Sequence, residues 1–180
     1  MRNYFCTFLL IVVNVIVFIL IRTSKLDEDD LSVSYHTVFN LRQYYRILTS
    51  AFTHSDPMHI LFNMISLYNV GTFVEAYFGH FWMLVIYFVS LILGRLMALY
   101  IRHNNRDDYT MTLGASGAIC GMLGAYFMTV LHYYGFSGFS YLLRPMVSLV
   151  MISVLPGVDG TSHFSCMAAG MAITYLLFLF

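Results

Sequence analysis

The sequence predicts an all-α membrane protein, and three observations lead to that fold class. Apolar residues make up 59% of the 180 residues and charged residues only 10%, whereas a typical soluble domain has about 45–50% and about 25% respectively. The charged residues cluster in short segments such as 27–30 and 102–108, and the long stretches between these segments carry almost no charge. Several stretches approach the roughly 20 apolar residues that a helix needs to cross a bilayer. We therefore expect a multi-pass integral membrane protein.

Six apolar segments account for most of the chain. The first is interrupted only by Asn14, and its apolar run is longer than that of a signal peptide, so we interpret it as a membrane span. Most loops between the segments are short, which favours one bundle of six helices in a single domain over residues 1–180. The expected spans are approximately 4–21, 58–78, 81–101, 115–133, 139–155 and 162–180.

The connection between the first two spans is the exception to the short loops. Its first part is acidic and polar, which is typical of a surface turn. In its second part, 35–52, apolar residues recur at three- and four-residue steps, and Arg42 and Arg46 lie away from them. These apolar residues are Val38, Leu41, Tyr45, Leu48 and Phe52. We expect an amphipathic helix that lies along the bilayer surface in this first loop.

The composition also excludes several classes of function. Nine Lys and Arg residues balance nine Asp and Glu residues, without a basic stripe, so no nucleic-acid partner is expected. Three cysteines in apolar surroundings cannot form a disulfide framework or a zinc knuckle. His54, Asp56 and His59 lie close together in the sequence, but no fourth ligand and no HEXXH motif accompany them. We therefore expect no metal and no other cofactor.

Two polar residues begin expected spans, where ionisable and polar groups indicate function. Ser116 begins the fourth span and His163 begins the sixth, and alternating spans place both residues at the same depth in the bilayer. Small residues let membrane helices approach closely, and Gly117, Gly121 and Gly170 occupy the two helices concerned. A serine hydroxyl becomes a useful nucleophile when a base lies within hydrogen-bond reach. The sequence therefore indicates a nucleophile and its base.

His59 and Asn63 begin the second span one helical turn apart, at the same expected depth as Ser116. Their N–H groups are suitable donors for a developing oxyanion. Taken singly, each of these residues could also be a structural residue with satisfied hydrogen bonds. Glu75, between Gly71 and Gly79, is expected to tie helix ends together.

These residues together resemble the rhomboid family of intramembrane serine proteases over nearly the whole chain. His59 and Asn63 match its HxxxN motif, and residues 114–117 match its GxSG motif. His163, seven residues before a glycine, is similar to the family's sixth-span histidine. Arg46, preceded by a tyrosine, stands where the family commonly has Trp-Arg, and His54 is similar to a frequent additional histidine.

The resemblance implies Ser116 as the nucleophile and His163 as the general base and then acid. It implies the side chains of Asn63 and His59 and the backbone N–H of Ser116 as oxyanion donors. Single-span membrane proteins in the lipid bilayer are the implied substrates. Asp159 is the carboxylate nearest to His163 in sequence, but we do not expect it to complete a triad.

An inactive rhomboid-like protein that binds or escorts membrane proteins is the alternative function. A small transporter or channel is a third possibility, but paired broken helices and a charge relay within the spans are missing from the sequence. Two positions depart from the family's pattern, because Cys120 replaces an aromatic residue and Cys166 replaces a glycine. We expect these two thiols to pack against each other. Arg95, in the third span, is expected to snorkel or to be paired.

Overall fold

The computed structural model describes residues 4–143, 145 and 159–179, and its named elements are all helical. This confirms the all-helical fold class for the part of the chain that is described. The segment η1 is a π-helix, whereas η2 and η3 are 3₁₀-helices. In chain order the elements are α1 (Phe5–Arg22), α2 (Glu28–Leu31), η1 (His36–Asn40), α3 (Arg46–Thr49), η2 (Ser50–Phe52), α4 (Pro57–Asn104), α5 (Ser116–Tyr134), η3 (Gly135–Leu142) and α7 (Gly160–Leu177).

The helix α4 consists of two helical halves that meet at Gly79. This residue has φ 78° and ψ 172°, a conformation that glycine adopts without steric cost. The kink lies between the segments 58–78 and 81–101, where the sequence predicts the boundary between two spans. At the start of α4, Asp56 Oδ1 accepts the N–H groups of Met58 and His59, each at 2.9 Å, and Pro57 occupies the first turn. Both features are typical of helix N-termini.

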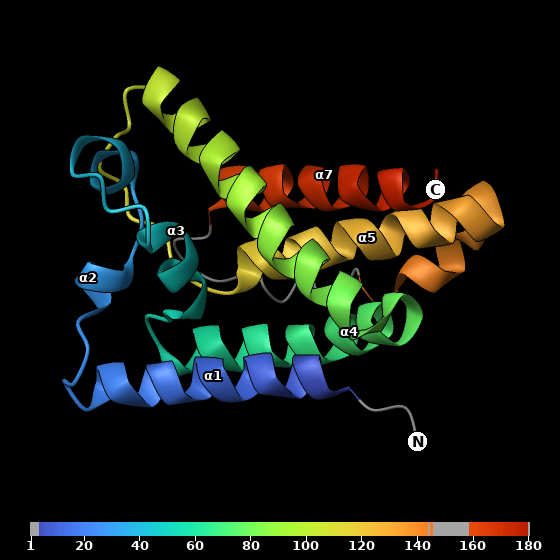
Figure 1. The fold of residues 1–180 in the computed structure, drawn as a ribbon, viewed down its shortest axis with the longest axis horizontal. Helices are drawn as coiled ribbons and strands as arrows, with labels where there is room; N and C mark the ends of the chain where they lie inside the picture. Colours follow the sequence, from blue (N-terminus) through green and yellow to red (C-terminus); the bar gives the residue numbers. More distant parts are fainter. Residues whose placement is uncertain (1–3, 144, 146–158, 180) are drawn as a thin grey trace.

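Figure 1 shows how the long helices are arranged. The first half of α4 runs alongside α1, and its second half crosses α5 and α7, which lie side by side. The core between them is formed by fully buried residues such as Leu67, Met83 and Ile119. The starts of α4, α5 and α7 all lie at the end of the bundle that carries the long connection over residues 23–56. The N-terminus of α1 and the kink of α4 lie at the opposite end.

The helices can be compared with the expected spans. The helices α1 and α4 are long and apolar enough to cross a membrane. The bounds of α5 and α7 lie within three residues of the expected spans 115–133 and 162–180. The expected fifth span, 139–155, lies largely outside the described residues, and its described beginning belongs to η3.

The prediction of one continuous amphipathic helix over 35–52 is wrong. The segment forms three short helical pieces, η1, α3 and η2, and Arg42 between them has φ 58°. A non-glycine residue in this left-handed region ends a right-handed helix. Of the apolar residues chosen from the spacing, Val38 packs inside the protein, whereas Leu41 and Leu48 are exposed on its surface.

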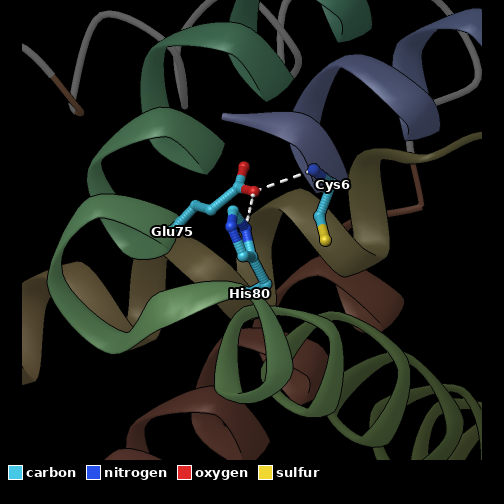
Figure 2. A group of neighbouring side chains, drawn as sticks. All are labelled: Cys6, Glu75 and His80. Atoms are coloured by element: carbon cyan, nitrogen blue, oxygen red, sulfur yellow. Dashed lines mark hydrogen bonds and ion pairs between the residues drawn. The ribbon is translucent and has the colours of Figure 1, made fainter. Parts of the chain in front are cut away.

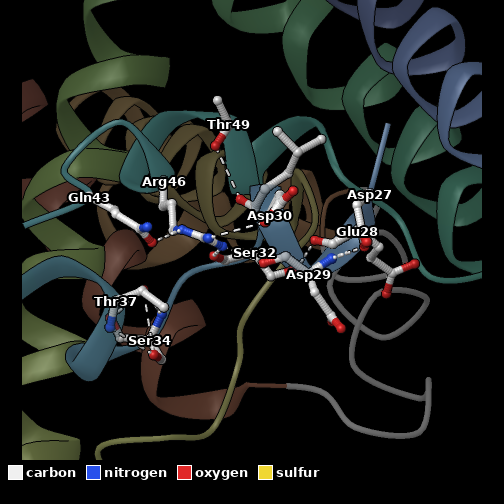
Figure 3. A network of polar contacts seen from close by, with 11 residues as sticks. Asp27, Glu28, Asp29, Asp30, Ser32, Ser34, Thr37, Gln43, Arg46 and Thr49 are labelled. Carbon is white, nitrogen blue, oxygen red and sulfur yellow. Dashed lines mark hydrogen bonds and ion pairs between the residues drawn. The ribbon is translucent and has the colours of Figure 1, made fainter. Parts of the chain in front are cut away.

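The side chain of Arg46 explains why this connection is folded irregularly (Figure 3). Its guanidinium is buried and donates to the backbone carbonyl of Ser32 at 3.0 Å, to that of Asp29, and to Gln43 Oε1 at 2.6 Å. A weaker ion pair joins it to Asp30 at 3.7 Å. Arg46 therefore binds carbonyls in α2 and at its C-cap, and it holds α2 against α3.

Candidate active site

Ser116 and His163 meet where α5 and α7 begin. The Nε2 atom of His163 lies 2.7 Å from Ser116 Oγ, and both side chains are largely buried. In the tautomer whose Nε2 carries no proton, the imidazole accepts the hydroxyl hydrogen. This is the geometry that nucleophile activation by a neighbouring base requires.

Close helix packing brings these two residues together. A Cβ atom added at Gly170 of α7 would meet the backbone of Gly121 in α5, including its Cα atom at 2.9 Å. A Cβ atom at Gly117 would meet Cys166 Sγ at 3.2 Å. The three glycines selected from the sequence therefore lie at the contact between α5 and α7, which is the packing that small residues permit in membranes.

A network around Asp159 holds the start of α7. Its Oδ1 atom accepts the N–H of Ser162 at 3.1 Å and pairs with Arg102 at 2.9 Å, and its Oδ2 atom accepts the Thr112 hydroxyl at 2.9 Å. Arg102 belongs to the last turn of α4, and Thr112 lies four residues before Ser116. Asp159 therefore ties the helix that carries His163 to two neighbouring segments. Sequence reasoning considered this carboxylate only as a third catalytic group and missed its role as a helix cap.

Gly114 shapes the approach to Ser116. Its φ of 103° is unfavourable for any residue with a side chain, and a Cβ atom there would meet His59 Nε2 at 2.7 Å. The structure therefore brings the His59 ring close to the loop before Ser116. Two hydrogen bonds hold this loop, because Gly114 N–H donates to the carbonyl of Ser50 at 2.8 Å and Arg95 Nη2 donates to the carbonyl of Gly114 at 2.9 Å.

Arg95 differs from its expected behaviour. Its side chain does not snorkel to a surface but is one of the largest fully buried side chains of the described residues. The expectation of a paired arginine is closer, because Arg95 donates to a backbone carbonyl, that of Gly114, although not to a carboxylate. The sequence contains no signal for this contact, because the partner is a main-chain atom 19 residues away.

The orientation of His59 depends on a residue that the sequence analysis did not select. Ser55 Oγ lies 3.2 Å from His59 Nδ1. The Ser55 hydroxyl has a single proton, which can go to Asp56 Oδ2 at 3.1 Å or to His59 Nδ1. When it goes to Nδ1, the proton of the neutral ring is on Nε2, the nitrogen that faces Gly114. Such a ring can donate a hydrogen bond near Ser116.

Asn63 is buried one turn further along α4. Its Nδ2 atom donates to the carbonyl of His59 at 2.8 Å, within its own helix. One N–H of this amide stays available, and the Oδ1 atom has no hydrogen-bond partner among the described residues. The amide can therefore still donate to a ligand.

His54 lies in the loop before α4. It is fully buried, and burial lowers the pKa of its imidazole to about 3. Its Nε2 atom is close to the N–H of Ala115, at 3.4 Å, which suits a neutral acceptor. The rings of His54 and His59 meet edge to face with centroids 5.0 Å apart.

Glu75 lies just before the kink of α4, at the end of the bundle opposite Ser116 (Figure 1). Its Oε2 atom accepts both the N–H and the hydroxyl of Thr7, at 2.9 and 2.6 Å, and its Oε1 atom accepts the N–H of Cys6 at 2.8 Å. The carboxylate therefore pairs two of the free N–H groups at the start of α1. In the structure, Glu75 joins α1 to α4.

Comparisons of the sequence with family models and with known proteins show to which family the chain is similar. The family model described as the rhomboid domain matches residues 41–180. RHOMBOID-like protein 4 of Arabidopsis thaliana is 29% identical over 143 residues, which are 75% of this chain and 34% of that protein. The "Inactive RHOMBOID-like protein 8" of the same plant is 33% identical over 93 residues, 52% of this chain and 25% of that protein.

A bacterial relative carries the word protease in its name. The "Rhomboid protease GluP" of Bacillus subtilis (strain 168) is 28% identical over 137 residues, 71% of this chain and 25% of that protein. The chain therefore spans between about a quarter and a third of the length of these three relatives.

Proposed function

Because the chain belongs to the rhomboid family of integral membrane proteins, we propose that it is an intramembrane serine endopeptidase with a Ser116–His163 dyad. The observation that carries this proposal is the 2.7 Å contact between Ser116 Oγ and His163 Nε2. Since the names of the relatives include both a protease and an inactive protein, family membership alone does not assign an activity.

In the proposed reaction, Ser116 Oγ attacks the scissile carbonyl carbon while His163 Nε2 takes the hydroxyl proton. The resulting oxyanion accepts hydrogen bonds from the backbone N–H of Ser116, from Asn63 and from His59. Support for the backbone donor comes from the start of α5, where the N-cap residue Ala115 makes no side-chain capping bond. The side chain of the N-cap residue therefore does not compete with an anion for the first N–H groups of α5.

His163 then returns its proton to the leaving amine as the peptide C–N bond breaks, which leaves an acyl ester on Ser116. Water attacks this ester with His163 again acting as the base, and the hydroxyl of Ser116 is regenerated. Single-span membrane proteins are the proposed substrates. A regular helix pairs its own carbonyls, so the substrate must unwind locally before Ser116 can attack it.

Cleavage by the purified chain tests the proposal. The chain in detergent is incubated with a single-span membrane substrate, and products are identified by mass spectrometry. Ser116→Ala and His163→Ala should each abolish cleavage without a large change in the thermal unfolding midpoint. Ser137→Ala and His132→Ala, at exposed positions, are matched controls that should retain activity. Substantial turnover by either dyad variant contradicts the assignment.

The alternative is an inactive rhomboid-like protein that binds or escorts membrane proteins. This alternative is considered because one relative is named an inactive RHOMBOID-like protein. Binding of substrates without cleavage by the unmodified chain, under conditions in which it is folded, would support this alternative. We favour the protease because both groups of the dyad are present and in hydrogen-bond contact.

A further inference from the structure

A second group of reactive side chains lies at the end of the bundle opposite Ser116. Cys6 comes from the first turn of α1, Glu75 from the first half of α4, and His80 from just beyond the kink at Gly79. One ligand atom from each of the three side chains lies within 4.8 Å of the others. Figure 2 shows the three side chains converging from the two helices.

The carboxylate of Glu75 is already held in position. The N–H groups of Cys6 and Thr7 and the hydroxyl of Thr7 bind it from the start of α1, and its side chain is only 1% exposed. His80 Nδ1 lies 2.5 Å from Oε1. The Cys6 thiol also lies within hydrogen-bond reach of the Glu75 carboxylate, but the three contacts from the two N–H groups and the Thr7 hydroxyl do not depend on the sulfur. The sulfur and the imidazole can therefore change partners while the carboxylate stays anchored.

We propose that Cys6, Glu75 and His80 bind a divalent transition-metal ion of the zinc class. Thiolate, imidazole and carboxylate are the ligand types that zinc takes in proteins. The thiolate and the carboxylate together carry two negative charges, which balance the charge of the ion at a site where both side chains are buried. Hard cations such as Mg²⁺ prefer oxygen ligands and fit this set poorly.

The distances fit this proposal after a small rearrangement. Zinc–ligand bonds of about 2.0–2.3 Å place neighbouring ligand atoms about 3.5 Å apart in a tetrahedral site. The three atoms, which now lie within 4.8 Å, must therefore close by at most about 1.3 Å, whereas Nδ1 and Oε1 must move apart from 2.5 Å. His80 is the ligand that can move, since its side chain is 53% exposed. The same exposure leaves the fourth position of the ion open to water.

Binding is a ligand exchange without a redox step. The thiol of Cys6 releases its proton to solvent and becomes a thiolate, and the neutral imidazole of His80 moves its proton from Nδ1 to Nε2, so that the lone pair of Nδ1 is free to bind the ion. The ion takes the place of the hydrogen that now lies between Nδ1 and Oε1. It would join α1 to both halves of α4 across Gly79, and so stabilise the end of the bundle remote from Ser116.

Cobalt provides a direct test, because a thiolate bound to Co²⁺ gives a charge-transfer band in the near ultraviolet. The full chain in detergent is stripped with a chelator and titrated with Co²⁺, and Zn²⁺ then displaces the cobalt. We expect a saturable band with one ion per chain. Zn²⁺ should also raise the thermal unfolding midpoint of the stripped protein, whereas Mg²⁺ at the same concentration should not.

Two variants remove one ligand each and leave the anchor of Glu75 in place. Cys6→Ala keeps the backbone N–H that binds Oε1, and His80→Ala changes an exposed side chain. Each should lower the affinity for Zn²⁺ at least about tenfold, the smallest loss usual even for groups that only support a ligand. Cys6→Ala should also abolish the charge-transfer band. Cys120→Ala and His132→Ala are matched controls and should retain both properties.

Three results would overturn the proposal. They are a stripped wild-type chain without the charge-transfer band, a band that persists in Cys6→Ala, and a Zn²⁺ affinity that His80→Ala leaves unchanged. If Cys6→Ala does not fold, the exposed position of His80 keeps the test decisive. The inference does not rest on the proposed protease activity, because every readout measures metal binding or unfolding and none measures cleavage.

Discussion

The substitution Gly170→Ala tests the helix contact on which the Ser116–His163 pair depends. The added methyl group would meet the backbone of Gly121, closest at the carbonyl oxygen and at 2.6 Å from the carbonyl carbon. Backbone atoms cannot rotate away as the end of a side chain can. Since a contact at 2.6 Å must open to the 3.4 Å at which ordinary contact begins, α5 and α7 must separate by at least 0.8 Å.

This separation should affect stability and activity together. Forcing extra volume into a packed core costs about 1–3 kcal/mol. For a chain of this length each kcal/mol corresponds to roughly 2–4 °C, so the thermal midpoint should fall by roughly 2–12 °C. The 2.7 Å contact between Ser116 and His163 joins the same two helices, and it would lengthen toward 3.5 Å, beyond good hydrogen-bond geometry. Misplacement by about 1 Å can lower the rate about a hundredfold.

Gly160→Ala is the matched control, because it makes the same substitution in the same helix. No atom of the described residues lies within 4 Å of a Cβ added at Gly160, so this variant should unfold and cleave like the wild type. Thermal unfolding in detergent and initial rates of substrate cleavage are measured for both variants. If Gly170→Ala matched Gly160→Ala in midpoint and rate, the close contact between α5 and α7 could not be what aligns the two residues.

Three further predictions concern groups around the site. Asn63→Ala should lower the cleavage rate about 10²- to 10³-fold, as expected for a lost oxyanion donor, and an unchanged rate would remove Asn63 from that role. Asp159→Ala should cost about 0.5–2 kcal/mol of stability, the usual value for a helix cap; it should also slow cleavage more than Thr112→Val, and equal rates would argue against a positioning role. His54 takes up its proton near pH 6.5 in the unfolded chain but only near pH 3 in the fold, so its contribution to stability is lost as pH falls, by about 2 kcal/mol between pH 7 and pH 5. The thermal midpoint of His54→Gln should therefore fall less than that of the wild type over this range, and an equal fall would contradict the buried neutral imidazole.

The approach of Ser116 to His163 could be anticipated because each step follows from local pattern. Apolar length defines the helices, the alternation of direction places two helix starts at one end, and glycines allow the helices to touch. Gly79 is a similar case, since a glycine followed by a polar residue between two apolar runs predicts a break. The cap formed by Asp56 and Pro57 is also visible in the sequence alone.

Other features could not be predicted, because their partners are backbone atoms or residues distant in the chain. The spacing of apolar residues over 35–52 is that of an amphipathic helix. The segment is nevertheless broken, and the buried guanidinium of Arg46 binds the backbone carbonyls of Asp29 and Ser32. Arg95 likewise binds a backbone atom, the carbonyl of Gly114, which the sequence does not reveal as a partner. Cys6 and Glu75 are separated by 69 residues, and only the packing of α1 on α4 brings them together. The periodicity of apolar residues predicts which face of a helix is apolar, but it does not predict contacts of this kind.

Cys166 illustrates how the surroundings of one residue span three helices. The sequence analysis paired it with Cys120, because a thiol at each position roughly conserves volume, and a sulfur–sulfur contact stays a prediction. The structure adds two partners. A Cβ atom at Gly94 of α4 would meet the backbone of Cys166, and one at Gly117 of α5 would meet its sulfur at 3.2 Å. Glycines on two neighbouring helices therefore let α7 pack closely at Cys166, about one helical turn after His163. The thiol is accommodated because α4 and α5 each present a glycine to it, so the packing of the helix that carries His163 depends on α4 as well as on the helix that carries Ser116.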